Sequence, residues 1–165
     1  MLMSCGDTAT TEPTPAAAPE EKVDYVYSID RPDTWVTGSK KNTESALKAL
    51  KGWETGDIAG TMGYWADTVT IEFDNYEATL SRDSLQANFT GYRSAYKSVA
   101  ITMQDWESVK SDVHNKEYVS LWYKQYNTHQ NGTVDSLEVM DDLGFKNGKI
   151  ISLNEKTRKL GPPKS

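Results

Sequence analysis

Two Asn-Gly dipeptides, Asn131-Gly132 and Asn147-Gly148, most strongly constrain how this 165-residue chain can fold. Asn and Gly tolerate the positive φ angles of a two-residue hairpin loop, so each dipeptide predicts a tight turn between antiparallel strands. Segments in which apolar and polar residues alternate flank both turns, and they predict strands over 118–128, 133–145 and 149–157. We therefore expect the chain to end in a meander of long antiparallel strands.

The first of these turns also predicts the register of its two strands. With Asn131-Gly132 as a two-residue loop, Trp122 lies opposite Asp141 and Tyr126 lies opposite Leu137. The shared face is mostly apolar and should be the concave face that packs on the helices. It carries Trp122, Tyr126, Leu137, Val139, Asp141, Leu143 and Phe145. A slip of one residue would reverse this assignment.

The N-terminal half of the domain predicts three helices. Thr43 can cap a helix that ends at Gly56, and Asp57 can cap a second helix that reaches Trp65. A third helix begins at Ser81 and places its apolar residues on one side, at Leu85, Phe89, Tyr92 and Tyr96. Alternation predicts two further strands, over 68–73 and 99–106. The pattern is that of an α+β fold whose sheet wraps around its longest helix.

Composition excludes several classes of function. The formal net charge is -6 and no basic cluster occurs, so we expect no nucleic-acid partner. The single cysteine, Cys5, cannot form an internal disulfide, and with His114 and His129 it has no zinc-binding spacing. We expect neither a metal nor a cofactor. No apolar stretch is long enough to span a bilayer.

The segment Leu2-Met3-Ser4-Cys5-Gly6 resembles a bacterial lipobox, in which the cysteine receives a lipid. Residues 1–5 would then be the remnant of a lipoprotein signal, and Cys5 would anchor an extracytoplasmic protein in the cell envelope, in the periplasm or at the outer membrane. The basic and apolar parts of a signal peptide do not precede the motif. Either the start codon lies further upstream or the match is accidental.

The remaining segments divide by composition. Residues 6–21 are rich in Thr, Pro, Ala and Glu, which predicts a disordered linker that would hold a folded domain away from a membrane. Residues 22–41 are more apolar but contain Pro32 and Gly38, and they predict an extended arm that lays Tyr27 and Trp35 against the domain. The domain itself should cover 42–160, with a tail at 161–165.

Three motifs give the domain a specific resemblance. They are Tyr64-Trp65-Ala66-Asp67-Thr68-Val69, Asn127-Thr128-His129-Gln130-Asn131-Gly132 and Phe145-Lys146-Asn147-Gly148-Lys149-Ile150. Their order and spacing are similar to the SnoaL-like and nuclear transport factor 2-like superfamily, over roughly residues 43–157. The resemblance implies a cone-shaped sheet with an open-ended pocket, and frequently a homodimer. It implies no single activity, because the superfamily includes cyclases, isomerases, epoxide hydrolases, dehydratases and proteins that only bind.

Asp141 is the leading candidate for chemistry. A carboxyl group on an apolar face has a raised pKa and can act as a general acid or base, as the pocket Asp does in the cyclases and isomerases that the chain resembles. Tyr126 could then donate to a developing oxyanion, and His129 could act as an acid or base. Alternatively, Asp141 is solvated or paired with Lys124.

Six residues are candidates for contact with a ligand: Trp65, Asp67, Trp106, Trp122, Tyr126 and Asp141. The tryptophans could line a cavity or belong to the core. Asp67 matches the acid at the helix-to-strand junction of the superfamily, where it could reach the pocket or form a cap or an ion pair.

Three functions agree with these observations. The first is a lipid-anchored extracytoplasmic domain that binds a small apolar ligand or a partner in the cone without catalysis. The alternative is an acid/base enzyme of the polyketide cyclase or ketosteroid isomerase type that uses Asp141. The third is a structural component of the envelope, for which aromatic side chains would fill the cone. An open pocket beside Asp141 would favour either of the first two.

Overall fold

The computed structural model describes residues 24–29, 34–74 and 76–161. The chain divides into two units, Met1–Asp30 and Arg31–Ser165. Residues 24–29 of the first unit form neither helix nor strand, and Tyr27 is exposed there. Cys5 and the predicted linker lie outside the described residues. The second unit contains the predicted domain.

The longest helix begins earlier than predicted. Strand β1 (Val36–Thr37) precedes helix α1 (Lys40–Thr55), which Ser39 caps by accepting a hydrogen bond from the Lys41 amide. Thr43 lies within the helix and is not its cap. Gly56 ends the helix as predicted, with a φ of 83° that an L side chain rarely adopts.

The second helix is shorter than predicted. Asp57 caps it, but helix α2 (Ile58–Thr61) is followed by the single 3-10 turn η1 (Met62–Tyr64). Strand β2 (Trp65–Phe73) starts at the residue that was expected to end the helix. The two glycines of this segment, Gly60 and Gly63, lower its helix propensity, while Trp65 pairs with Ile150 of the sheet.

A strand that was not predicted follows. Strand β3 (Tyr76–Ser81) forms a hairpin with β2. Helix α3 (Arg82–Ser94) follows where a helix was predicted, and Ser81 is its cap. Tyr96, expected on the helix, is the first residue of the next strand.

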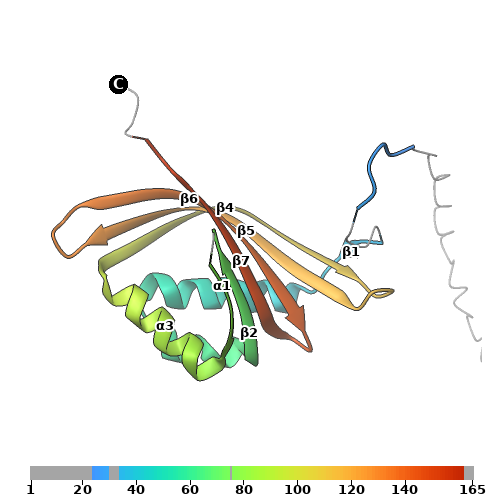
Figure 1. Ribbon diagram of the computed structural model, residues 1–165, viewed down its shortest axis with the longest axis horizontal. Coiled ribbons are helices and arrows are strands. Elements are labelled where there is room, and N and C mark those ends of the chain that lie inside the picture. The colour runs from blue at the N-terminus through green and yellow to red at the C-terminus, as the bar shows by residue number, and fades with distance from the viewer. Residues whose placement is uncertain (1–23, 30–33, 75, 162–165) are drawn as a thin grey trace, which may run out of the picture. The chain divides into compact units, whose positions relative to one another are not determined.

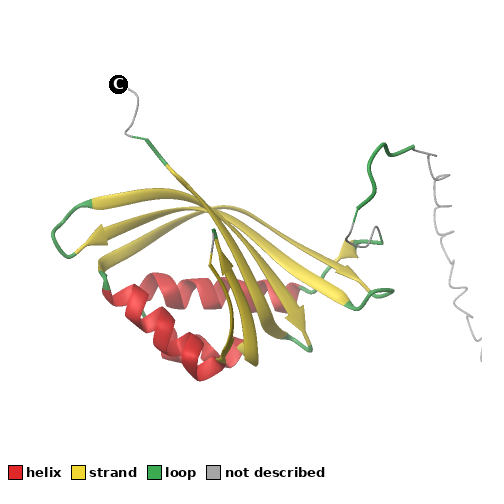
Figure 2. Cartoon of the chain, in the orientation of Figure 1, coloured by secondary structure: helices red, strands yellow, loops and turns green. Residues whose placement is uncertain are grey.

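The sheet has seven strands in the order β1-β4-β5-β6-β7-β2-β3. The four long ones are β4 (Tyr96–Ser111), β5 (Lys116–His129), β6 (Val134–Lys146) and β7 (Lys149–Lys159). All neighbouring pairs are antiparallel except β2 and β7, so the sheet is mixed and not purely antiparallel. It bends over α1 and α3, which lie on one of its sides (Figures 1 and 2). The α+β fold with a cone-like sheet is confirmed.

The predicted register of β5 and β6 is wrong by one residue. Asp141 lies opposite Leu121, and Met140 lies opposite Trp122. The cause is a loop of three residues, Gln130 to Gly132, in which the His129 amide donates to the Thr133 carbonyl and the Gly132 amide donates to the His129 carbonyl. Only Gly132 has a positive φ in this loop, and the Asn131 side chain accepts from the amide and the hydroxyl of Thr133.

This register exchanges the faces of β5 but not those of β6. Leu121, Tyr123 and Gln125 point to the core with Val139 and Asp141 of β6, and all five are buried. Trp122 and Tyr126 therefore lie on the outer face of the sheet, which corrects the prediction that they line its concave face. The second turn behaves as predicted, because Asn147 and Gly148 both have positive φ angles between the paired Lys146 and Lys149.

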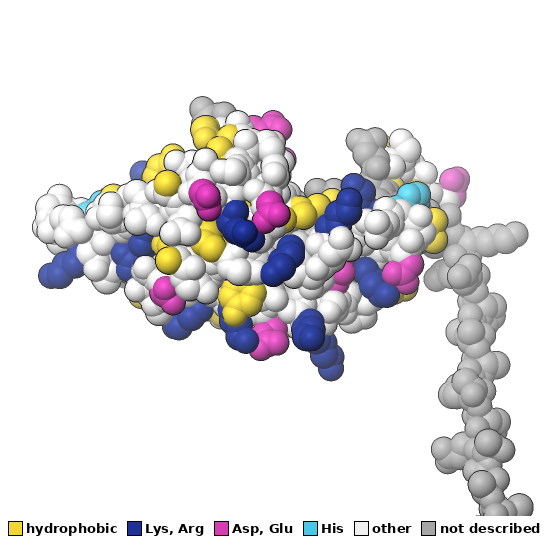
Figure 3. Space-filling view, turned by 90° about the horizontal axis from the view of Figure 1, so that it is seen from below, with side chains coloured by type: hydrophobic (Ala, Val, Ile, Leu, Met, Phe, Trp, Pro, Cys, Tyr) yellow, Lys and Arg dark blue, Asp and Glu magenta, His cyan; other side chains and the backbone are white. Residues whose placement is uncertain are grey.

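The core lies between the sheet and the helices. Its fully buried members include Ala46 of α1, Leu85 of α3 and Val119, Leu121 and Ile150 of the sheet. On the face shown in Figure 3, basic and acidic side chains are interspersed, with small apolar groups between them. None of the described helices is long and apolar enough to cross a membrane.

Candidate functional site

A cavity of about 460 Å³ opens between the helices and the concave face of the sheet. Aromatic and aliphatic side chains form most of its wall. They come from α1, α3 and the inner faces of β5 and β6. Two half-exposed tyrosines, Tyr76 and Tyr92, also line it, so the cavity is accessible from solvent. The aromatic residues leave the cone open.

Three polar side chains from adjacent strands meet in this wall. Asp141 of β6 lies opposite Glu155 of β7, and the Tyr123 hydroxyl of β5 donates to Asp141 Oδ2 at 2.8 Å. Asp141 and Tyr123 are almost completely buried, whereas Glu155 is half-buried. Glu155 has no hydrogen-bond or ion-pair partner among the described residues. The strand pairing thus places two carboxyl groups side by side in an apolar cavity.

The pKa values of this cluster follow from its surroundings. Burial, reinforced by the charge of Glu155, raises the pKa of Asp141 well above its ordinary range, and the Tyr123 hydrogen bond only partly opposes this. Burial and the nearby Asp74 carboxylate raise the pKa of Glu155 to about 7. Burial and Asp141 raise the pKa of Tyr123 as well. Burial thus disfavours the charged form of Asp141, whereas Glu155 gains and loses its proton near neutral pH.

A β-bulge brings Glu155 to this position. The turn at Asn147-Gly148 pairs Phe145 with Ile150, but Gly144 pairs with Ser152, so the register shifts by one residue between these two pairs. Without this shift Asn154 would lie opposite Asp141. The bulge thus supplies the second carboxyl group.

The aromatic side chains of the wall form a continuous series of edge-to-face contacts. Trp65 contacts Phe89 at 5.6 Å between ring centroids, Phe89 contacts Trp53 at 6.3 Å, and Trp53 contacts Tyr96 at 6.5 Å. Tyr96 in turn contacts His129 at 5.1 Å. These contacts orient the rings along one side of the cavity.

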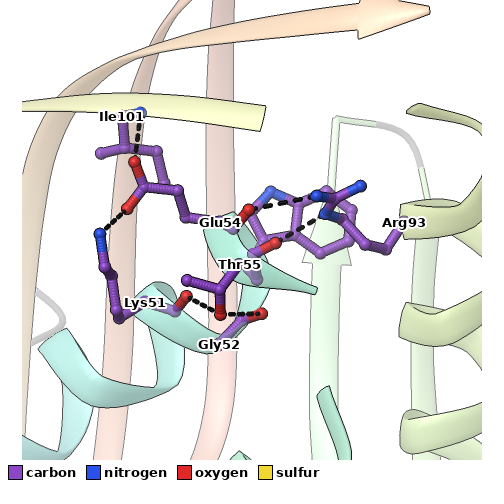
Figure 4. A network of polar contacts seen from close by, with 7 residues as sticks. Lys51, Gly52, Glu54, Thr55, Arg93 and Ile101 are labelled. Atoms are coloured by element: carbon purple, nitrogen blue, oxygen red, sulfur yellow. Dashed lines mark hydrogen bonds and ion pairs between the residues drawn. The ribbon is translucent and has the colours of Figure 1, made fainter. Parts of the chain in front are cut away.

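Arg93 of α3 fixes the end of α1 that carries Trp53. Its guanidinium group donates to the main-chain carbonyls of Trp53 and Glu54 at 2.9 and 3.2 Å (Figure 4). It also donates to the main-chain carbonyl of Tyr96 at 3.1 Å. The Glu54 carboxylate accepts from the main-chain amide of Ile101 in β4 and from Lys51. This network satisfies carbonyls that a helix end leaves without partners, and it links α1 to α3 and β4 beside the cavity.

Three buried polar atoms of the cavity residues have no hydrogen-bond partner among the described residues. They are Trp65 Nε1, Asn127 Oδ1 and Asp141 Oδ1. A fourth polar residue, Gln125, accepts from Trp53 Nε1 at 3.0 Å. Buried polar atoms are seldom left unpaired in proteins, so this concentration beside one cavity indicates a site that a ligand or ordered water completes.

The structure brings only some of the predicted site residues together. Asp141 and Trp65 line the cavity. Trp122 and Tyr126 lie on the opposite face of the sheet and do not line it. A tyrosine does contact Asp141, but it is Tyr123.

The other predicted site residues lie elsewhere. His129, near the end of β5, pairs with Asp135 at 2.7 Å and reaches the cavity wall only through the ring of Tyr96. Trp106 is half-exposed and lies beside α1, in a separate groove with Leu47. Asp67 is largely exposed and forms an ion pair with Arg82 at 3.1 Å.

The sequence analysis did not predict that Tyr123, Glu155 and Asp74 line the cavity. The alternation of β5 would have indicated Tyr123 if the loop at Asn131-Gly132 had been given three residues. No local signal marks Glu155, because the bulge that places it depends on the pairing of β6 with β7. Asp74 lies in the turn between β2 and β3, where it adopts a φ of 45°.

A metal site has no support in the described part of the chain. No group of three or more His, Cys, Asp or Glu residues within it could hold a metal ion.

Comparison with known structures agrees with the architecture of the sheet and helices. An NTF2-like protein of unknown function from Burkholderia pseudomallei superposes with a TM-score of 0.59, at 12% identity over 73% of this chain and 92% of that chain. The fold is nuclear transport factor 2-like. AclR, a candidate hydroxylase from Streptomyces galilaeus, superposes with a TM-score of 0.58, at 17% identity over 72% of this chain and 89% of that chain.

AusH from Aspergillus nidulans is a third structure with this nuclear transport factor 2-like fold. It has a TM-score of 0.58 and 14% identity, covering 74% of this chain and 87% of that chain. No family model and no curated protein matches the chain in sequence. At such identities the likeness establishes the fold, and the function has to be argued from the site itself.

Proposed function

We propose that this domain binds a small, mostly apolar molecule in its cone, and that the molecule carries a polar group for the Asp141–Glu155 cluster. The observation that carries the proposal is the open cavity of about 460 Å³ with an apolar wall and unpaired polar atoms in it. Small-molecule sites in proteins have this size and this combination of surfaces.

A pair of substitutions on one strand tests the proposal. Leu137 and Met140 both lie in β6, but Leu137 lines the cavity and Met140 lies on the outer face. A library of small aromatic and cyclic molecules would be screened by ligand-observed NMR. We expect Leu137→Trp to weaken binding of the hits because the indole occupies part of the cavity, and Met140→Trp to leave binding unchanged. Equal binding to both variants would place the hits elsewhere and overturn the proposal.

Acid/base catalysis is the second candidate, and the pairing of Asp141, whose pKa is raised, with Glu155, whose pKa is about 7, favours it. Two carboxyl groups with different pKa values can divide the roles of acid and base. In this enzyme Tyr123, and not Tyr126, would be the tyrosine that contacts Asp141. The roles predicted for Tyr126 and His129 would have to be indirect, because neither residue lines the cavity.

Deuterium exchange distinguishes catalysis from binding. Cyclic ketones would be incubated with the protein in heavy water, and NMR would follow exchange at the carbon beside the carbonyl. An enzyme of this type would accelerate exchange, and Asp141→Asn would abolish it while leaving the circular dichroism spectrum unchanged. A protein that only binds would give no acceleration with any variant.

Envelope anchoring stays a proposal that the lipobox-like segment at Cys5 and the composition of residues 6–21 support. Under it, Cys5 carries a lipid and the domain faces the outside of the cytoplasmic membrane. Metabolic labelling with an alkynyl fatty acid should mark the protein and not its Cys5→Ala variant. The homodimer implied by the resemblance is likewise a proposal, which light scattering of the purified domain tests.

A further inference from the structure

The charges around the cavity have one sign. Three carboxyl groups, those of Asp74, Asp141 and Glu155, are in its wall. No Lys, Arg or His occurs among the described residues that line it. Arg93 adjoins the wall at Trp53 and Tyr96, but its guanidinium group is directed at three main-chain carbonyls. The carboxyl groups of the cavity therefore have no cationic partner in the described part of the chain.

Glu155 is the carboxyl group for which the missing cation matters most. Its half-buried carboxyl group is faced by Asp141 from β6, by Phe73 from β2, and by the Asp74 carboxylate beyond β2. Tyr96 and Tyr123 are the other titratable groups that sense its charge. An ionised carboxylate in such surroundings is costly unless a cation compensates it.

The rest of the wall is suited to a cation as well. The series of aromatic rings from Trp65 through Phe89 and Trp53 to Tyr96 lines the same cavity. Aromatic faces attract organic cations, with Trp the strongest of them, and they also accommodate the apolar part of such a molecule.

From this juxtaposition we propose that the ligand of the cone is an organic ammonium ion, an apolar or aromatic amine whose charged nitrogen lies near Glu155 and Asp74 and whose apolar body contacts the aromatic wall. The inference rests on the proposed binding function and names its ligand class. Asp141 accepts from Tyr123, and burial raises its pKa and disfavours its charged form, so we assign the polar surface to Asp141 and the charge to Glu155.

Three molecules of one shape test the inference with the intact chain. Phenethylamine is a cation at pH 8, phenethyl alcohol is neutral, and phenylpropionate is an anion. We expect the amine to bind at least about tenfold more tightly than the alcohol in calorimetry at pH 8, and the anion more weakly than both. The amine should bind more weakly at pH 6, where Glu155 is protonated, whereas the alcohol should bind equally at both values.

Matched variants test which carboxyl group causes the preference for the amine. Glu155→Gln should weaken amine binding about tenfold and leave alcohol binding unchanged. Asp74→Asn, at an exposed position, should weaken the amine alone by a smaller factor. Glu138→Gln is the control, because Glu138 lies on the outer face, paired with Arg158, and should change neither. Thermal unfolding of each variant checks that the domain is folded.

The outcomes separate this inference from the function on which it rests. If the alcohol or the anion binds as tightly as the amine and Leu137→Trp weakens that binding, the cone is a ligand site and the ammonium inference is wrong. If none of the three binds, both the inference and the proposed function fail for ligands of this size. An amine preference that survives Glu155→Gln also overturns the inference.

Discussion

Asp141 and Glu155 lie opposite each other on β6 and β7, two carboxyl groups in the wall of one apolar cavity. An extra residue in β7, Ile151, shifts the register between β6 and β7 and produces this pairing. The Tyr123 hydroxyl is the one hydrogen-bond donor that either group has among the described residues. The arrangement stores unfavourable electrostatic energy in the folded state. The stability of the domain should therefore depend on pH.

The stability of the domain should fall as the pH rises from about 4.5 to about 7. The pKa of Glu155 is 4.5 in an unfolded chain and about 7 in the folded one, so the folded state holds a proton that the unfolded state has lost in this range. Asp141 acts in the same direction. We expect a loss of about 1–3 kcal/mol in urea unfolding between pH 5 and pH 8. Glu155→Gln should flatten this slope and stabilise the domain at pH 8, and an unchanged slope would contradict the assignment.

Tyr123→Phe should destabilise the domain by about 1–3 kcal/mol, because it leaves both oxygens of a buried carboxyl group without a donor. The same substitution in an Asp141→Leu background should cost less, since the acceptor is then absent. A double-mutant cycle by chemical denaturation measures the difference. Additive costs would mean that the hydrogen bond contributes nothing to stability.

Arg93→Ala should destabilise the domain by about 2–4 kcal/mol, because three carbonyls that close α1 and begin β4 lose a charged donor. Arg93→Lys should recover part of this loss, since an ammonium group cannot serve all three acceptors at once. Arg158→Ala is the control, an exposed arginine paired with Glu138, and should change stability by less than about 0.5 kcal/mol. Equal effects at Arg93 and Arg158 would contradict the anchoring role.

Two helical glycines should respond to alanine with opposite signs. A Cβ on Gly52 of α1 would lie 2.2 Å from Thr61 Cγ2 and 2.9 Å from the Asp57 carbonyl oxygen, whereas one on Gly91 of α3 would meet nothing within 4 Å. Gly91→Ala should stabilise the domain by about 0.5–1 kcal/mol through helix propensity alone. Gly52→Ala should destabilise it despite the same propensity gain, because the α1–α2 contact must open. Thermal unfolding of the two variants gives the comparison.

Deletion of Gln130 should be tolerated. It would shorten the β5–β6 loop to Asn131-Gly132 and keep the pairing of Thr128 with Val134, so no side chain would change faces. The cost should be within about 1 kcal/mol, from the altered turn and the lost contact of Gln130 with the Ser94 carbonyl. Deletion of Ser136, within β6, should prevent folding, because it would shift the strand that carries Val139 and Asp141 by one residue. Similar stability of the two deletions would contradict this account of the register.

Local chemistry determined much of what could be predicted. Ser81 and Asp57 cap their helices through short side chains that bond to nearby amides. Gly56 ends α1 because glycine adopts the required positive φ angle without steric cost. The Asn147-Gly148 turn and the alternating strands were predictable for the same reason. Each signal acts within a few residues, so it can be seen in a sequence without any knowledge of the fold.

The contents of the site depended on tertiary structure. Asn131-Gly132 is compatible with a loop of two residues or of three. The three-residue loop buries the apolar face of β5 against the helices, with Tyr123 on the inner face of the sheet and Trp122 on the outer face. The bulge beside Gly144 then brought Glu155, and not Asn154, opposite Asp141. The sequence by itself thus determined the fold class and the position of Asp141 on the inner face of its strand. The neighbours of Asp141 were decided by strand registers, which depend on the whole buried face and not on any single turn.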